Sequence, residues 1–498
     1  MVFTTQSFLF FFLPCCLVLY YAVSAAKKIK CISAFMCKIR AREVILFCIS
    51  MGFYSWTCFD DGLRFLLYIF VVYIAGMILQ RYSENGKYFI LGKQNESNMH
   101  QLRFATLTLA LSVCIILFIL TKYKYSAAFT SIWNFLFKET LQGKSVIAPI
   151  GISFITFSAI SYLADIYHGK AKAGSILDCA LYLSMFSKVI SGPIVLYRDF
   201  RSASDNCRID IENISYGMTR VMYGFAKKLI IADVFGALIS TTENYAIDAP
   251  IALGVALLYM LQIYYDFSGY SDIALGLSAM LGYRFKENFD FPYLSCSITE
   301  FWRRWHISLG TWFKEYVYIP LGGNRKSKRR TIINILIVFF LTGLWHGVGF
   351  AFVIWGMIHG ICNALEKLCR DKTFYKKIPK AFKWLFTMIV LYFSWELFRF
   401  GSLHSAKHWL ITAFGLSGNA TIPYTWRYYF DARIIFLVTV AILGATVFGL
   451  PKVRELRERF ISTKIGYAIR QILIVLLFAV SILFMVNSTY NPFLYFQF

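Results

Sequence analysis

The chain has 498 residues, of which 58% are hydrophobic and 16% are charged, and its formal net charge is +24. A soluble globular protein of this length carries a larger charged fraction, so the composition excludes that class. The positive charge is spread over loops along the whole chain and not over one soluble face. This distribution argues against a nucleic acid as the partner.

Apolar segments long enough to cross a bilayer recur along the whole chain. The first, residues 7–23, has no clear cleavage site after it, so we interpret it as a helix and not as a signal peptide. The expected fold class is an all-α polytopic membrane protein with about ten to twelve transmembrane helices. The candidate segments are residues 7–23, 43–58, 63–79, 104–120, 147–167, 175–196, 251–263, 332–358, 382–398, 434–449 and 472–486.

Patterns that mark other classes of protein do not occur. The twelve cysteines show neither CxxC nor zinc spacing, so no metal site is expected. No GxxxxGK[ST] or GxGxxG motif supplies the nucleotide site of a pump. Residues 25–43 hold six Lys and Arg side chains against one glutamate, which predicts a cytoplasmic loop. Residues 1–498 are expected to form one membrane domain, with core motifs at 262–360 and an aromatic tail at 490–498.

Polar residues interrupt an apolar pattern in YYDFSGYSDIALG, residues 264–276. Asp266 and Ser268 precede Gly269, and three more polar residues follow at 270–272, so Gly269 between them predicts a break in the helix. Irregular backbone at membrane depth persists only inside protein or along a water-filled cavity. We therefore interpret the stretch as the wall of a polar cavity, with a loop at the membrane interface as the alternative.

The next stretch, ITEFWRRWHISLGTWF at residues 298–313, predicts an amphipathic or re-entrant helix. Ser297 and Glu300 have the spacing of a capping box at its start, and Pro320 ends it. His306 adjoins its apolar stripe and is either an interfacial or hydrogen-bonded core residue or a functional one. The stripe consists of Trp302, Trp305, Leu309, Trp312 and Tyr316, flanked by Arg303 and Arg304.

A basic run, NRKSKRR at residues 324–330, directly precedes an apolar segment. One interpretation is a positive-inside flank. The other is an electropositive entrance for a polyanion such as coenzyme A, whose phosphates suit Arg and Lys. Both interpretations place the run on the cytoplasmic side. Its basic residues are Arg325, Lys326, Lys328, Arg329 and Arg330.

His346 lies in LTGLWHGVGF, residues 341–350, between two apolar segments. A histidine there is costly unless it faces protein or a cavity. The surrounding glycines predict closely packed or broken helices. Imidazole can remove a proton from a hydroxyl at neutral pH, so His346 is the candidate general base, with a structural role as the alternative. His359 is a weaker candidate for the same role, with packing or support of the site as the alternative.

Together these stretches resemble the membrane-bound O-acyltransferase family, in its bacterial, alginate O-acetyltransferase-like branch. The motifs that carry the resemblance are YYDFSGYSDIALG, ITEFWRRWHISLGTWF, YIPLGGNR and LWHGVGFAFVIWGMIHG, in this order. The resemblance implies a ring of tilted helices around a central tunnel, with re-entrant segments. It assigns the essential family histidine to His346 and a second functional position to His306. The tunnel residues would be Trp302, Trp305, Arg303, Arg304, Asp266, Ser268, Trp345 and His359.

The same resemblance implies an acetyltransferase of the bacterial cytoplasmic (inner) membrane. Acetyl-CoA would be the donor substrate, and no cofactor would be bound permanently. The acetyl group would pass across the bilayer to an SGNH-type acetyltransferase partner, which acetylates an extracellular or cell-envelope polysaccharide. Acyl transfer from a carrier-protein thioester, such as D-alanylation, is an alternative. A polysaccharide transporter or flippase and a non-catalytic scaffold are the others.

The carboxyl-terminal residues FLYFQF, 493–498, contain the pattern F-x-Y-x-x-F. From composition, this is an aromatic anchor at the membrane interface. It also resembles a terminal tyrosine motif of the teichoic-acid D-alanylation machinery, which implies that Tyr495 carries the acyl group after His346 removes its proton.

Overall fold

The computed structural model describes residues 2–26, 40–56, 58–85, 96–137, 148–417 and 422–487. These residues form helices and no β-strand, so the predicted all-α class is confirmed. They group into two compact units, Met1–Met218 with Ala274–Lys286 and Thr219–Ile273 with Glu287–Phe498. The unit boundaries fall within α11 (Ile211–Phe225), within α13 (Ala249–Met280) and between Lys286 and Glu287. The single domain and the central tunnel stay predictions.

Seven helices among the described residues are long and apolar enough to cross a membrane, which makes the protein a polytopic membrane protein. In six of them only 17–33% of the apolar window is buried within the protein, whereas α13 is 83% buried. Exposed apolar surface of this extent requires lipid around it. The seven segments are Ser7–Ala26, Phe59–Tyr82, Met99–Lys124, Ala249–Met280, Lys380–Phe400, Ala432–Gly449 and Lys464–Asn487.

Four of the eleven predicted segments are not among these seven. Two of them, 43–58 and 147–167, form helices of only 15 and 16 residues, and the other two are broken. Residues 175–196 divide into α8 (Ile176–Ser184) and α9 (Phe186–Val189). Residues 332–358 divide into α16 (Lys328–His346) and α17 (Phe350–Cys369). His346 therefore ends a helix and does not lie in the middle of a span.

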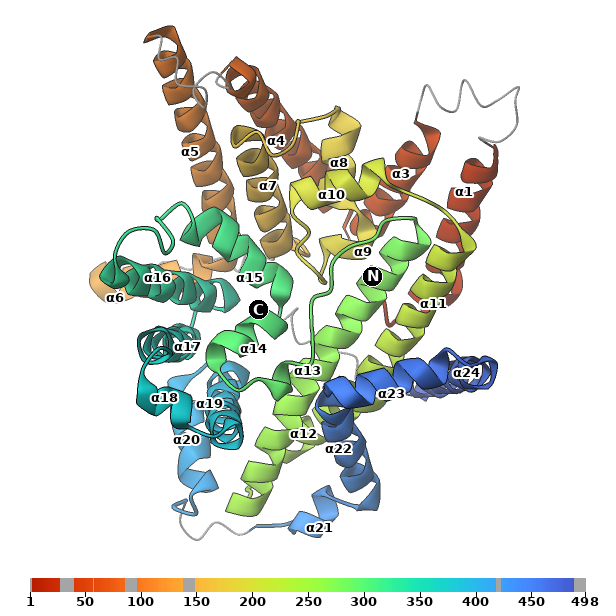
Figure 1. The fold of residues 1–498 in the computed structure, drawn as a ribbon, viewed down its shortest axis with the longest axis vertical. Helices are drawn as coiled ribbons and strands as arrows, with labels where there is room; N and C mark the ends of the chain where they lie inside the picture. The colour runs from red at the N-terminus through yellow and green to blue at the C-terminus, as the bar shows by residue number, and fades with distance from the viewer. Residues whose placement is uncertain are drawn as a thin grey trace. The chain divides into compact units, whose positions relative to one another are not determined.

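The first unit holds three long helices that lie side by side, α4 (Phe59–Asn85), α5 (Glu96–Lys124) and α7 (Ile152–Tyr167) (Figure 1). The helix α3 (Ala41–Ser55) packs against α4 and α8. The remaining elements of this unit are η1 (Ser7–Phe12), α1 (Leu13–Ala26), α6 (Ser126–Phe137) and α10 (Tyr197–Asp205).

The second unit is built around a group of packed helices, α14 (Ile298–Arg304), α15 (Ile307–Phe313), α16, α17 and α19 (Lys380–Phe400). The other elements are η3 (Ala226–Ala232), α12 (Asp233–Thr242), η4 (Pro292–Leu294), η5 (Lys314–Tyr318), α18 (Thr373–Lys377), α20 (Leu403–Ala413), α21 (Trp426–Tyr429), α22 (Ala432–Ala445), η6 (Val447–Gly449), α23 (Pro451–Ile461) and α24 (Lys464–Asn487).

Glycines bring α16 and α17 into close contact. A Cβ atom on Gly343 would lie 2.5 Å from the Phe352 carbonyl oxygen, and one on Gly356 would lie 2.4 Å from the Phe339 carbonyl oxygen. Small residues let helix backbones approach each other in this way. The close packing that the glycines predict is therefore present between α16 and α17.

Two predictions about helix continuity are wrong. Gly269 does not break its helix, because α13 continues through it to Met280. A Cβ atom there would lie 2.9 Å from the Gly224 carbonyl oxygen of α11, so the glycine serves a close helix crossing. Conversely, the predicted helix from Ser297 to Pro320 is divided into α14, α15 and η5. The break between α14 and α15 falls at Trp305 and His306.

Candidate active site

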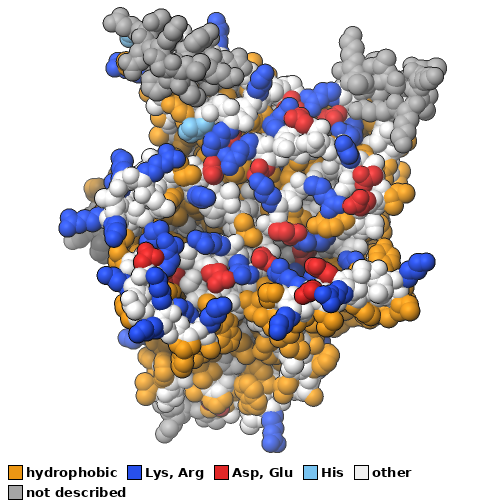
Figure 2. Space-filling view, in the orientation of Figure 1, with side chains coloured by type: hydrophobic (Ala, Val, Ile, Leu, Met, Phe, Trp, Pro, Cys, Tyr) orange, Lys and Arg blue, Asp and Glu red, His pale blue; other side chains and the backbone are white. Residues whose placement is uncertain are grey.

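A pocket of about 1130 Å³ lies in the second unit, among α14, α15, η5, α16 and α17. Its volume is large enough for a small-molecule ligand. On the face shown in Figure 2, Lys and Arg side chains gather over α14 to α18, and apolar side chains cover the lower part, over α20 and α22. The pocket lining contains six basic residues, Arg303, Arg304, Lys314, Lys367, Arg370 and Lys383, against three acidic ones, Asp290, Glu300 and Glu366.

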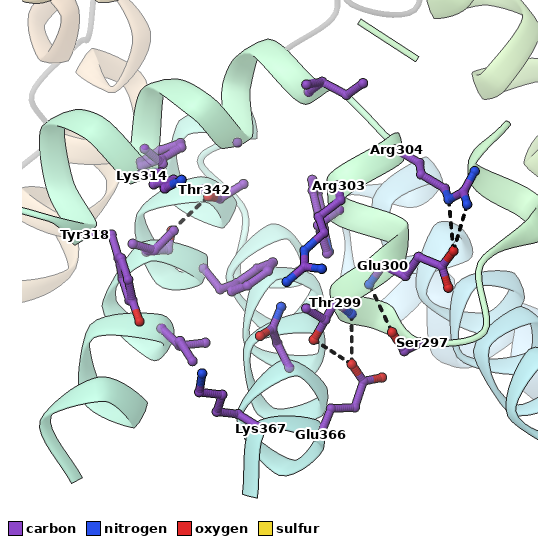
Figure 3. A pocket seen from close by; sticks show the side chains of 18 of the residues that line it. Ser297, Thr299, Glu300, Arg303, Arg304, Lys314, Tyr318, Thr342, Glu366 and Lys367 are labelled. Atoms are coloured by element: carbon purple, nitrogen blue, oxygen red, sulfur yellow. Dashed lines mark hydrogen bonds and ion pairs between the residues drawn. The ribbon is translucent and has the colours of Figure 1, made fainter. Parts of the chain in front are cut away.

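The two adjacent arginines of α14 differ in their partners. Arg304 forms ion pairs with Glu300 at 2.9 Å and with Asp290 at 3.4 Å. Arg303 points into the middle of the pocket (Figure 3) and forms no ion pair with the described residues. A guanidinium in this state is suited to bind an anionic group of a ligand.

A carboxylate from α17 fixes the start of α14. Glu366 accepts hydrogen bonds from the backbone N–H groups of Ile298 and Thr299, at 2.6 and 2.8 Å, and from the Thr299 hydroxyl at 2.7 Å. The first N–H groups of a helix lack partners within it, and a negative charge at that end is favourable. Ser297 caps α14 as predicted, since its hydroxyl accepts from the Glu300 N–H at 3.0 Å.

The break between α14 and α15 is held at His306. This residue has a left-handed backbone with φ of 45°, which is uncommon for a residue other than glycine. Its side chain is fully buried, and burial lowers the pKa of His306 from 6.5 to about 3, so the ring is neutral. The Phe267 ring of α13 packs at right angles to it, 4.6 Å between centroids.

Asn288 organises His306, and the sequence analysis missed it. The Asn288 Oδ1 accepts from the Ser308 N–H at 3.2 Å and from the Ser308 hydroxyl at 2.8 Å. Because this oxygen is an acceptor, the His306 Nδ1 that lies 3.2 Å from it carries the ring proton. The Nε2 atom is therefore a hydrogen-bond acceptor. No short-range pattern could have indicated this, because the two residues are 18 positions apart.

His346 closes α16 in a buried aromatic environment, with 3% of its surface exposed. The rings of Trp345, Trp355 and Phe398 lie 4.6, 5.1 and 5.0 Å from it. The Trp345 ring also lies 6.4 Å from that of His306, so this tryptophan is close to both histidines.

The pocket reaches the neighbourhood of both histidines without being lined by them. Ile307, the residue after His306, lines it, and so does Thr342. Thr342 precedes His346 by four residues, which is about 6 Å along a helix. The structure therefore brings His306, Trp345 and His346 together near a cationic pocket.

Of the other predicted tunnel residues, Trp302, Arg303 and Arg304 line this pocket. Trp305 is 1% exposed and packs against Trp395, with 5.0 Å between centroids. His359 accepts a hydrogen bond from the Trp302 indole N–H at 3.3 Å.

Two predicted residues of α13 are buried away from the pocket lining. The Asp266 carboxylate forms an ion pair with Lys228 of η3 at 2.8 Å, and Ser268 is 2% exposed. It is Phe267, between them, that contacts His306.

The five basic residues of the run are not among those that line the pocket, although Asn324, which begins the run, lines it. Arg325 and Lys326 are exposed in a turn, and Lys328, Arg329 and Arg330 form the first turn of α16, with Ser327 as its cap. Positive charges at a helix amino terminus are unfavourable to the helix dipole, so the helix gains nothing from them. Tyr495 and the tail at 490–498 lie outside the described residues.

These features define a polytopic membrane protein with a cationic pocket beside buried histidines. Residues 91–404 match the membrane-bound O-acyltransferase family. The chain is 35% identical to the probable alginate O-acetylase AlgI of Pseudomonas putida, over 100% of both chains. It is 32% identical to the peptidoglycan O-acetyltransferase of Helicobacter pylori, over 66% of this chain and 68% of that one.

A third relative is the teichoic acid D-alanyltransferase of Streptococcus thermophilus, which is 29% identical over 49% of this chain and 63% of that one. The chain belongs to the membrane-bound O-acyltransferase family, as the sequence motifs indicated, and is an O-acyltransferase.

Proposed function

We propose that the protein takes an acetyl group from acetyl-CoA on the cytoplasmic side of a bacterial inner membrane and passes it across the membrane, for O-acetylation of a cell-envelope polysaccharide. The observation that carries this proposal is the cationic pocket that leads toward His306 and His346. The names of the relatives, an alginate O-acetylase and a peptidoglycan O-acetyltransferase, support a polysaccharide as the final acceptor.

Coenzyme A fits the charge of the pocket. Its phosphates are matched by Arg303, which points into the pocket, and by Lys314 and Lys367 in the lining. Its pantetheine arm passes along Trp302 toward the buried histidines. The basic run at the start of α16 attracts the donor from the cytoplasm.

In the proposed reaction, His346 removes the proton from an acceptor hydroxyl, and the oxygen attacks the thioester carbonyl. The carbon–sulfur bond then breaks, and the proton passes to the sulfur, which yields an acetyl ester and free CoA. The closely packed aromatic surroundings of His346 exclude water, which limits hydrolysis of the thioester.

His306 has a separate role in this proposal. With its proton held by Asn288, its Nε2 accepts a hydrogen bond, so it orients a donor group of the substrate, such as the acceptor hydroxyl. Stabilising an oxyanion would require an N–H at Nε2, whereas the single proton of the neutral ring is directed to Asn288.

The partner in this proposal is an SGNH-type acetyltransferase on the outer side. Tyr495 relays the acetyl group. His346 deprotonates the Tyr495 phenol, which attacks the thioester and forms an aryl ester, and this ester is a reactive acyl donor. D-alanyl transfer from a carrier-protein thioester is the second candidate, favoured by the likeness to a D-alanyltransferase.

The test uses purified full-length protein with the outer partner. The protein is given acetyl-CoA, or the D-alanyl thioester of a carrier protein, and thiol release and acyl transfer to the partner are measured. We expect transfer from acetyl-CoA. Transfer only from the carrier thioester would support the second candidate, and no thioester consumption from either donor would contradict both.

A further inference from the structure

His359 joins three helices through one line of hydrogen bonds. The Trp302 indole N–H of α14 donates to the His359 Nδ1 of α17 at 3.3 Å. The His359 Nε2 lies 3.1 Å from the Ser394 hydroxyl oxygen of α19. The Ser394 hydroxyl donates to the Leu391 carbonyl oxygen at 3.1 Å. His359 and Ser394 are 0% and 2% exposed, so water does not compete for these bonds.

This pattern fixes the protonation state of His359. An indole N–H can only donate, so Nδ1 carries no proton. The proton is therefore on Nε2, which donates to the Ser394 hydroxyl oxygen, while the Ser394 proton is directed to Leu391. Both ring nitrogens are engaged within the protein, and His359 is not among the residues that line the pocket. The geometry therefore does not favour His359 as a second base.

The Trp302 ring is held on its other sides by aromatic neighbours. Phe339 and Trp355 pack edge-on to it, at 5.4 and 5.8 Å between centroids. Trp355 in turn lies perpendicular to the His346 ring, at 5.1 Å. Because Trp302 and Phe339 both line the pocket, a rotation of the Trp302 indole would alter the pocket wall and the packing of Trp355 on His346.

We propose that His359 is a positioning residue, which accepts the Trp302 N–H and so fixes this indole as the wall of the donor pocket next to His346. The inference rests on the proposed function for the identity of the donor, but not for the hydrogen bond itself. Losing the bond lets the indole rotate, which weakens thioester binding and misaligns the reacting groups.

The test is a double-mutant cycle on the purified full-length protein. His359→Phe keeps a ring but removes the acceptor, and Trp302→Phe keeps a ring but removes the donor. We expect each substitution to lower kcat/KM for the thioester about 5- to 20-fold, chiefly by raising KM. The double variant should be no less active than the less active of the two single variants. His359→Asn, which keeps an acceptor near the Nδ1 position, restores much of the loss.

Trp384→Phe is the matched control. Its indole N–H donates to the Tyr293 carbonyl oxygen at 2.8 Å, outside this line of bonds, and we expect wild-type kinetics. Additive losses in the cycle would overturn the proposal. A catalytic histidine would give a different pattern, in which His359→Asn is as inactive as His359→Phe while Trp302→Phe is fully active. That pattern would also overturn the proposal.

A second readout needs no activity. In protein labelled with ¹⁵N-tryptophan, the Trp302 indole resonance is assigned by its loss in Trp302→Phe. We expect it to move in His359→Phe and to stay near its wild-type position in His359→Asn. An unmoved resonance in His359→Phe overturns the positioning role even if acetyl-CoA is the donor. If the resonances behave as expected but the wild-type protein does not use acetyl-CoA, the proposed function is contradicted and the positioning role is kept.

Discussion

At the scale of single residues, the proposed chemistry depends on two histidines that are buried in different surroundings. His346 ends α16 among aromatic rings. His306 occupies a strained break and is tied to Asn288. The motif around His346 could be identified from the sequence, because a histidine between apolar segments is costly. The role of Asn288 could not, because it depends on a left-handed turn that the helical stripe of tryptophans concealed.

Replacing His346 tests the proposed general base. We expect His346→Ala to lower the transfer rate by about 100- to 10,000-fold, because no other group would take the proton. The rate is measured with purified protein whose folding is checked by thermal unfolding. His404→Ala, which removes an exposed histidine of α20, is the control and should be fully active. A variant at position 346 that keeps more than about a tenth of the rate would assign the proton transfer elsewhere.

Replacing Asn288 tests how His306 is oriented. We expect Asn288→Ala to lower kcat about tenfold, since a buried ring loses the hydrogen bond that fixes its proton on Nδ1. The loss should not add to that of His306→Ala, because both changes remove the same oriented Nε2. Fully additive losses in the double variant would show that Asn288 acts independently of His306.

At the scale of secondary-structure elements, the sequence indicated where helices begin better than where they break. Ser297 was correctly identified as a cap, because capping depends on neighbouring residues. The break at His306 and the continuity of α13 through Gly269 depend on contacts with other helices. Glu366, which anchors α14, is 67 residues distant from its partner Thr299, so no local pattern could indicate it.

Neutralising the basic run at the start of α16 should affect ligand affinity and protein stability differently. Neutralising Arg325, Lys326, Lys328, Arg329 and Arg330 together should weaken acetyl-CoA binding and reduce its dependence on salt, since exposed charges are screened. The same change should not lower the unfolding temperature, because Lys328, Arg329 and Arg330 in the first turn of α16 oppose the helix dipole by about 0.3–1 kcal/mol each. Affinity is measured across salt concentrations. Unchanged affinity at low salt would leave the run only its topological role.

At the scale of the whole molecule, the composition predicted the class of membrane proteins, because a chain that is 58% hydrophobic needs lipid around its apolar surface. The number of spans was harder to predict, since hydropathy does not distinguish a long helix from two short ones joined by a buried turn. Residues 332–358 show this difficulty, as their apolar run contains the end of α16 and the start of α17.

The proposed relay across the membrane gives a prediction for the tail. Tyr495→Phe keeps the aromatic ring for anchoring and removes only the oxygen, so we expect normal insertion and an unacetylated polymer. Mass analysis of the wild-type protein with acetyl-CoA should show an acetyl group on the terminal peptide, absent in Tyr495→Phe and in His346→Ala. Normal polymer acetylation by Tyr495→Phe would return the segment to the role of an anchor.

The tie between Glu366 and α14 has a consequence for how the protein is made. The ribosome synthesises Thr299 67 residues before Glu366, a delay of about 3–13 s at ordinary translation rates. During that time the amino terminus of α14 lacks its carboxylate partner, and its free N–H groups are costly in lipid. The nascent segment therefore waits in water or within the insertion machinery until α17 is synthesised. Stalling translation between these two points should leave α14 accessible to water-soluble labelling reagents, and release should protect it.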